Sequence, residues 1–299
     1  MSSNNDTHST ALERLLNRTW SLVGEPIIEK FEELGLIGSE ASSTCRVWWC
    51  LTGSLAFLPI HASFPSTKSA RGMMDIAVSS YTPTISALLR AQERNKHSTF
   101  QMLVVGQANA LNTVPLPGVK KEIQVIRNLL TPLQAKFQVL EDSDANVEGV
   151  AGALPACSWA HFACHGVQEA DKPMDSGLVM WNGNRLTLSK VAQSSLASPQ
   201  FALLSSCETA TGSKQFPNEA VHLAAGLQFV GFRGVIGTMW SVGDEHALSV
   251  ATQVYEELFK DGAAKASASE AALALHRAVL HLRGHVPVAR WVPFVHFGL

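Results

Sequence analysis

The sequence predicts a three-layer α/β fold, in which helices cover both faces of a mostly parallel sheet. From residue 100 onward, short apolar segments alternate with segments whose apolar residues recur at helical spacing. The apolar segments contain few polar residues, as is typical of parallel strands buried on both faces. Hydrophobic residues make up 46% of the chain and charged residues 16%, which excludes a disordered protein.

The chain is predicted to consist of a polar tail and one domain with two parts. Residues 1–10 are polar and predict a disordered tail. The domain spans residues 11–299, of which 11–97 predict a smaller N-terminal α+β subregion and 98–299 the main α/β core. The length of the chain suits a single large domain of this kind.

The N-terminal subregion is expected to mix helices and short strands. Apolar spacing over 11–35 predicts one or two helices, with a break near residues 24–26, where glycine and proline occur. The segments RVWWCL (46–51) and LAFLPIHA (55–62) predict two strands joined as a hairpin. We further expect a strand over 77–81 and a helix over 83–94.

The core is expected to alternate strands and helices. The predicted strands cover 100–107, 136–141, 159–164, 201–207, 234–240 and 290–297. The predicted helices cover 120–130, 146–154, 189–196, 218–230, 245–260 and 269–283. The sequence Asn-Gly-Asn at 182–184 predicts a short hairpin. Sheets of this kind place their sites at the carboxyl ends of the strands.

Composition excludes several classes of protein. A net charge of −2, with no run of Lys or Arg longer than two, argues against a nucleic-acid binder. The first ten residues lack the features of a secretory signal, and the apolar stretch 222–240 is too broken to cross a membrane. Five cysteines without a CxxC pair favour a reduced compartment. We therefore expect a cytoplasmic protein that needs no cofactor.

Two predicted strands end in residues capable of covalent chemistry. The strand over 159–164 runs into His165, and the strand over 201–207 ends at Cys207. The two residues are 42 positions apart, which leaves room for one crossover between neighbouring parallel strands. An imidazole beside a thiol takes the thiol proton and later protonates the leaving amine. His165 and Cys207 are therefore predicted to form a catalytic dyad.

The residue after the histidine is predicted to help stabilise an oxyanion. Gly166 has no side chain to obstruct its own N–H, which together with the N–H of Cys207 would form an oxyanion hole. The alternative is that Cys207 is an ordinary buried residue and His165 a hydrogen-bonded loop histidine. Serine-hydrolase and P-loop chemistry are disfavoured, since neither GxSxG nor GxxxxGK[ST] occurs.

A zinc site is a further alternative, because Cys157, His161, Cys164 and His165 are close in the sequence. Strand alternation places His161 and His165 on one face and Cys164 on the other. Ligands from a single strand cannot converge on a tetrahedral metal. We therefore predict no metal site, and we expect His161 to be a hydrogen-bonded core residue.

A candidate substrate pocket follows the neighbouring strands. The strand over 234–240 leads to Asp244, whose carboxylate would select a basic substrate side chain, with Trp240 as an apolar wall. The loop 115–118, which ends at Gly118, is expected to line the same groove. Each prediction has a simpler alternative: Asp244 caps the following helix, and the loop is a plain connection.

Seven blocks of sequence, in order, carry a resemblance to a known family. They are RVWWCLTGSLAFLPIHA, VSSYTPTISALL, LPGVKKEI, WAHFACHG, LLSSCETATG, FVGFRGVIGTMWSVGDEHA and RWVPFVHFG. With these blocks, nearly the whole chain after about residue 10 resembles the CHAT domain, a caspase-like family also related to separase. The resemblance implies a caspase-hemoglobinase fold and a dyad of His165 and Cys207. By similarity to separase, it implies that Asp244 contacts a basic P1 residue of the substrate.

The sequence departs from related patterns in two places. Residues 205–209 (SSCET) replace the caspase signature Q-A-C-x-G, so specificity for aspartate is not implied. Gly243 occupies a place where many relatives carry a second acidic residue, which weakens the expected selection of basic side chains. Relatives often carry helical repeats ahead of the domain, so either this chain works alone or it needs a recruiting or activating protein partner.

The leading hypothesis is a CHAT-type cysteine endopeptidase that acts on a protein or peptide substrate, with cleavage after a basic residue. The competing hypothesis is a catalytically silent CHAT interaction or signalling module that retains the dyad as part of its fold. Selective reaction of Cys207 with a peptide probe, dependent on His165, would distinguish the two.

Overall fold

The computed structural model describes residues 2–37, 45–67, 70–93, 99–169, 171–205 and 219–299. Its main feature is an eight-stranded sheet with the order β1-β2-β11-β10-β9-β5-β3-β4. Neighbouring strands are parallel throughout, except that β11 runs antiparallel to β10. The predicted fold class is confirmed.

The strands are β1 (Cys45–Trp49), β2 (Ala77–Tyr81), β3 (Met102–Gly106), β4 (Phe137–Glu141), β5 (Trp159–Ala163), β6 (Gly166–Val167), β7 (Gly177–Val179), β8 (Arg185–Thr187), β9 (Phe201–Leu204), β10 (Gly234–Thr238) and β11 (Phe294–Gly298). The α-helices are α1 (Ser2–Thr19), α2 (Glu25–Glu33), α3 (Met73–Ile76), α4 (Ile85–Glu93), α5 (Gly118–Leu130), α6 (Val147–Ala153), α7 (Leu188–Gln193), α8 (Glu219–Val230), α9 (Asp244–Phe259), α10 (Ala271–Arg283) and α11 (Val288–Trp291). Among the described residues, no helix is both long and apolar enough to span a membrane.

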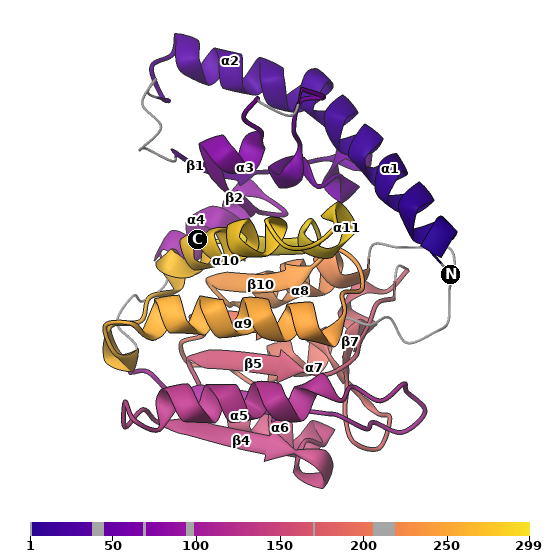
Figure 1. The fold of residues 1–299 in the computed structure, drawn as a ribbon. Helices are drawn as coiled ribbons and strands as arrows, with labels where there is room; N and C mark the ends of the chain where they lie inside the picture. The colour runs from indigo at the N-terminus through magenta and orange to yellow at the C-terminus, as the bar shows by residue number, and fades with distance from the viewer. Residues whose placement is uncertain (1, 38–44, 68–69, 94–98, 170, 206–218) are drawn as a thin grey trace.

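The sheet separates two hydrophobic cores. Helices α5, α9 and α10 cover one face, and α6, α7 and α8 cover the other (Figure 1). Side chains alternate along each strand: Leu103 and Val105 of β3 pack in the core beneath α6–α8, whereas Met102 and Val104 pack in the core beneath α5, α9 and α10. This burial on both faces explains why the core strands are apolar along their whole length.

Helix α1 runs from Ser2 to Thr19 and so includes residues 2–10, which were predicted to form part of a disordered tail. Helix α1 starts at Ser2, because extending a formed helix costs little once its first turn exists. A π-helical turn, Trp20–Gly24, joins α1 to α2 at the predicted break. Pro26 lies in the first turn of α2 and has no N–H, which accounts for the widened turn before it.

The predicted hairpin in the N-terminal subregion is wrong. Residues 55–62 form no strand, because Gly53 (φ +58°) turns the chain and Pro59 interrupts it, and 3₁₀ turns occupy Gly53–Phe57 and Ile60–Ala62. Strand β1 pairs in parallel with β2 instead, from Cys45–Ala77 to Trp49–Tyr81. The subregion thereby extends the sheet of the core.

The last strand begins later than predicted. Residues Val288–Trp291 form a helical turn, and β11 starts at Phe294. Pro293 has no N–H to donate to a neighbouring strand, so the regular pairing begins after it. The hairpin predicted at 182–184 is confirmed: Gly183, with φ +77°, lies between β7 and β8 of a separate three-stranded sheet.

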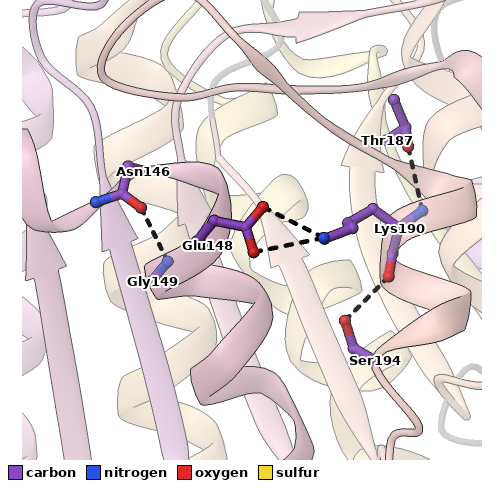
Figure 2. A network of polar contacts seen from close by, with 6 residues as sticks. All are labelled: Asn146, Glu148, Gly149, Thr187, Lys190 and Ser194. Carbon is purple, nitrogen blue, oxygen red and sulfur yellow. Dashed lines mark hydrogen bonds and ion pairs between the residues drawn. The ribbon is translucent and has the colours of Figure 1, made fainter.

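Side-chain caps define the starts of α6 and α7, and the capping residues are drawn in Figure 2. The Asn146 side chain accepts the Gly149 N–H at 2.9 Å at the start of α6, and Thr187 Oγ1 accepts the Lys190 N–H at 3.1 Å at the start of α7. Lys190 Nζ contacts Glu148 Oε1 at 3.3 Å, which links the two helices. This exposed ion pair contributes little to stability.

Candidate active site

The strand order β10-β9-β5-β3 brings the predicted site segments to one edge of the sheet. Strands β5 and β9 are parallel neighbours, with Phe162 opposite Leu204, as the sequence predicts. His165 follows β5 by two residues. Cys207, the predicted nucleophile, lies outside the described residues, which end at Ser205 on this side of the gap.

His165 is held by a backbone carbonyl. Its side chain is buried, and its Nε2 lies 2.6 Å from the carbonyl oxygen of Val114, in the loop after β3. A carbonyl can only accept a hydrogen bond, so Nε2 carries the proton. In the neutral ring the lone pair therefore lies on Nδ1, which is the nitrogen that can take up a proton. A backbone acceptor has no side-chain signature, so the sequence did not reveal Val114.

The Gly166 N–H points away from β7. The Val179 N–H donates to the carbonyl of His165 at 2.8 Å, which makes these two residues a hydrogen-bonded pair of the antiparallel ladder. Such pairs alternate with non-bonded pairs, so Gly166, opposite Leu178, belongs to the non-bonded kind. Its amide is thereby directed to the side of β6 that β7 does not cover.

Asp244 and Gly118 are brought together. Asp244 is the first residue of α9, but Gly243 occupies the N-cap position and no side chain caps this helix. The Asp244 Oδ2 instead accepts the Gly118 N–H, at 2.9 Å, at the start of α5. A Cβ atom on Gly118 would lie 2.8 Å from the Cβ of Asp244, so only glycine allows this approach. The simpler prediction, that Asp244 caps its own helix, is wrong.

Trp240 lies two residues beyond β10 and is partly buried. Its indole N–H donates to the carbonyl of Ala289 at 3.2 Å, which anchors the ring beside α11. The side chain packs against both hydrophobic cores. An apolar surface is therefore fixed two residues beyond β10, on the segment that leads to Asp244.

A buried polar cluster lies next to these residues. Glu122 is 3% exposed, and its Oε1 lies 3.4 Å from the Nε2 of His161, whose Nδ1 is 3.0 Å from the Tyr255 hydroxyl. Burial lowers the pKa of His161 to about 3, so its ring is neutral and its contact with Glu122 is not an ion pair. His161 is thus a hydrogen-bonded core residue, as predicted.

The charge of Glu122 is set by its surroundings. Burial raises its pKa to about 7; the Ser205 hydroxyl acts against burial, and the Asp244 carboxylate acts with it. Ser205 is buried at the end of β9, yet neither its Oγ nor Glu122 Oε1 has a hydrogen-bond partner of good geometry within the described part of the chain. Burial and the charge of Glu122 also raise the pKa of Tyr255 well above its usual value.

Glu122 was not among the predicted site residues, although the sequence contains a signal for it. The buried face of α5 is formed by a stripe at helical spacing, and it comprises Val119, Glu122, Ile123, Ile126 and Leu130. A carboxylic acid within such a stripe is a mismatch that indicates either a buried partner or a site. Within the described residues, no three His, Cys, Asp or Glu side chains are placed to hold a metal ion.

Comparison with known proteins identifies the family of the chain. The family model for the CHAT domain matches residues 13–299. The chain superposes on a chain of the Saccharomyces cerevisiae separase–securin complex with a TM-score of 0.54 and 12% identity, covering 94% of this chain and 17% of the other. For a complex of Porphyromonas gingivalis RgpB pro- and mature domains, the TM-score is 0.52 at 11% identity, covering 97% and 68%.

The Arg-specific cysteine proteinase gingipain R (RgpB) gives a TM-score of 0.44 at 15% identity; the match covers 74% of this chain and 53% of the proteinase. The chain thus spans about half of that proteinase. No curated protein sequence matches. At these identities, the two superpositions with higher scores show a shared fold. The chain belongs to the CHAT family and has the fold seen in the separase–securin and RgpB structures.

Proposed function

We propose that this protein is a cysteine endopeptidase in which Cys207 is the nucleophile and His165 is the general base and acid. The observation that carries the proposal is the hydrogen bond from His165 to Val114, at the end of the strand beside the one that leads to Cys207. It fixes the ring with Nδ1 as the basic nitrogen, which is what a proton acceptor for a thiol requires.

The proposed reaction uses groups at this edge of the sheet. His165 takes the thiol proton, the sulfur of Cys207 attacks the peptide carbonyl, and the N–H groups of Gly166 and Cys207 stabilise the oxyanion. As the C–N bond breaks, His165 protonates the leaving amine, and water then hydrolyses the thioester. The outward direction of the Gly166 amide supports its role in this scheme.

We propose a pocket for a Lys or Arg side chain beside the dyad. Asp244 supplies the carboxylate, the main chain at Gly118 forms the adjoining wall and holds that carboxylate, and Trp240 covers the aliphatic part of the substrate side chain. The close contact of Gly118 with Asp244, across the ends of β3 and β10, supports this assignment.

A protein partner is part of the proposal. Two of the structures with the same fold are complexes, one with a pro-domain and one with securin. We infer that a partner that recruits the substrate, or releases the site, controls this chain as well. Activity assays should therefore include candidate partners and not only the isolated chain.

The test compares the wild-type chain with Cys207→Ala and His165→Ala on a peptide library under reducing conditions. We expect cleavage by the wild type alone, with Lys or Arg before the cleaved bond. If wild type and Cys207→Ala are equally inert, with and without candidate partners, the endopeptidase proposal fails and an interaction module is favoured.

A further inference from the structure

Glu122 is a buried carboxyl that the proposed dyad does not use. It lies on α5, is 3% exposed, and has one oxygen without a hydrogen-bond partner among the described residues. Within the same residues, its one contact with a basic side chain is with the neutral ring of His161. A carboxyl buried without a cation is unfavourable in its charged form.

The position of Glu122 connects it to the proposed substrate pocket. It lies one helical turn after Gly118, whose N–H binds Asp244 at 2.9 Å. The buried Ser205 hydroxyl, also without a partner of good geometry among the described residues, comes from the end of β9. Three elements, α5, α9 and β9, therefore bring two carboxyls and a hydroxyl to the same edge of the sheet.

A bound cation would stabilise these two carboxyls in their charged form. Two neighbouring carboxylates repel each other, and a bound guanidinium or ammonium group relieves the repulsion of both. A guanidinium carries five N–H donors in a plane, enough for two carboxylates and a hydroxyl. The Asp244 charge contributes to the raised pKa of Glu122, so the two carboxyls interact electrostatically.

We propose that Glu122 is a specificity-determining residue that provides, with Asp244, the second negative charge of the pocket for a Lys or Arg side chain. This inference rests on the proposed function, because it concerns the substrate pocket of that peptidase. Ser205 contributes a further acceptor for the same side chain. The groups that face Glu122 are His161 from β5, Ser205 from β9, and Asp244 and Tyr255 from α9.

The first experiment measures kcat/KM for one peptide with arginine before the cleaved bond and for the same peptide with citrulline, its uncharged isostere. The proteins are wild type, Glu122→Gln, Asp244→Asn and the control Glu148→Gln, which changes an exposed glutamate on α6. We expect Glu122→Gln to lower the preference for arginine about tenfold, mainly through KM, and Glu148→Gln to leave it unchanged.

An unchanged preference in a folded Glu122→Gln variant, when Asp244→Asn lowers it, would assign Glu122 to the support of His161 alone and overturn the inference. This outcome differs from failure of the proposed function, in which the wild type cleaves neither peptide. The second measurement covers that case and the case of a variant that does not fold, because the result that would overturn the inference is obtained with the wild-type chain alone.

The second measurement uses calorimetry to follow the binding of agmatine, a small guanidinium compound, to the full chain. We expect binding to tighten several-fold between pH 6 and pH 8, as Glu122 ionises, and we expect this dependence to disappear in Glu122→Gln. Wild-type binding that is absent or independent of pH over this range would contradict the inference.

Discussion

His61 and His165 are both buried, and in both the Nε2 lies against a distant backbone carbonyl. In the N-terminal subregion, His61 Nε2 lies 2.9 Å from the carbonyl of Val292, and its Nδ1 is 2.7 Å from the Tyr81 hydroxyl. Both ring nitrogens are therefore used within the fold. His165 differs in its place, at the carboxyl end of a core strand beside the strand that leads to Cys207. A fixed imidazole is thus not a catalytic one by itself, and its position in the sheet is the reason that His165, and not His61, is proposed as the base.

Alanine substitutions of the two histidines should affect activity and stability separately. We expect His165→Ala to lower kcat/KM on a peptide substrate by roughly a thousandfold or more, because the thiol loses its base. His61→Ala should leave kcat/KM of the folded protein unchanged but lower the free energy of unfolding by about 2–4 kcal/mol, since Tyr81 and Val292 lose their partner. Peptide hydrolysis and urea unfolding measure the two effects. Equal losses of activity in both variants would remove the distinction.

The contribution of Glu122 to the free energy of unfolding should change with pH in the opposite direction to the contribution of a buried histidine such as His61. Because burial raises the pKa of Glu122 to about 7, the folded protein holds its proton more tightly than the unfolded chain, and stability falls as the pH rises from 4.5 to 7. We expect this contribution to reach about 3 kcal/mol and to be absent in Glu122→Gln. The measurement is the difference in the free energy of unfolding between wild type and Glu122→Gln, followed from pH 4.5 to pH 7.

His61 provides the matched comparison for that pH effect. Burial lowers its pKa to about 4, so its contribution to stability is lost as the pH falls from 6.5 toward 4. Subtracting the Glu122→Gln profile from that of the wild type cancels this contribution. A difference that does not vary between pH 4.5 and 7 would contradict the account of Glu122.

Asp244 should affect substrate choice more than the chemical step. We expect Asp244→Asn to lower the preference for arginine over citrulline between tenfold and about a hundredfold, with little change in kcat for the citrulline peptide. Steady-state kinetics on the two peptides distinguishes this from a general loss. A matching fall for both peptides would show that Asp244 serves only to hold α5 through Gly118.

The smallest effect is expected away from the site. Glu148→Gln removes the exposed ion pair between α6 and α7 and should change the free energy of unfolding by less than about 0.5 kcal/mol. Urea unfolding of this variant sets the baseline for a glutamate without a buried role. A change in the free energy of unfolding as large as the one expected for Glu122→Gln between pH 4.5 and pH 7 would show that burial is not what makes Glu122 distinctive.

The core strands could be predicted from the sequence because each is apolar throughout and is followed by a helix or a turn. The segment 55–62 has the same composition but a proline within it, and a short apolar run does not by itself distinguish a strand from a 3₁₀ turn. The strand order also depends on long-range pairing, such as β11 with β2, which no local pattern encodes.

The position of His165 just beyond the end of β5 could be predicted, because an apolar strand runs directly into it. Val114 acts through its carbonyl, so its identity gives no indication of the contact. Asp244 was identified as a carboxylate near the edge, but its bond to Gly118 depends on the packing of α5 against α9. Glu122 is harder to predict, because it is a single polar residue within the otherwise apolar buried stripe of α5, and the stripe alone predicts only a core-facing helix.

The central claim is that His165 activates Cys207. The most direct test is labelling of the full chain with a thiol-reactive peptide probe that carries arginine, followed by mass spectrometry of all five cysteines. The account predicts rapid modification of Cys207 over the other four, lost in His165→Ala and retained in His61→Ala. Slow labelling of the accessible cysteines without preference for Cys207, or labelling that survives His165→Ala, would contradict it.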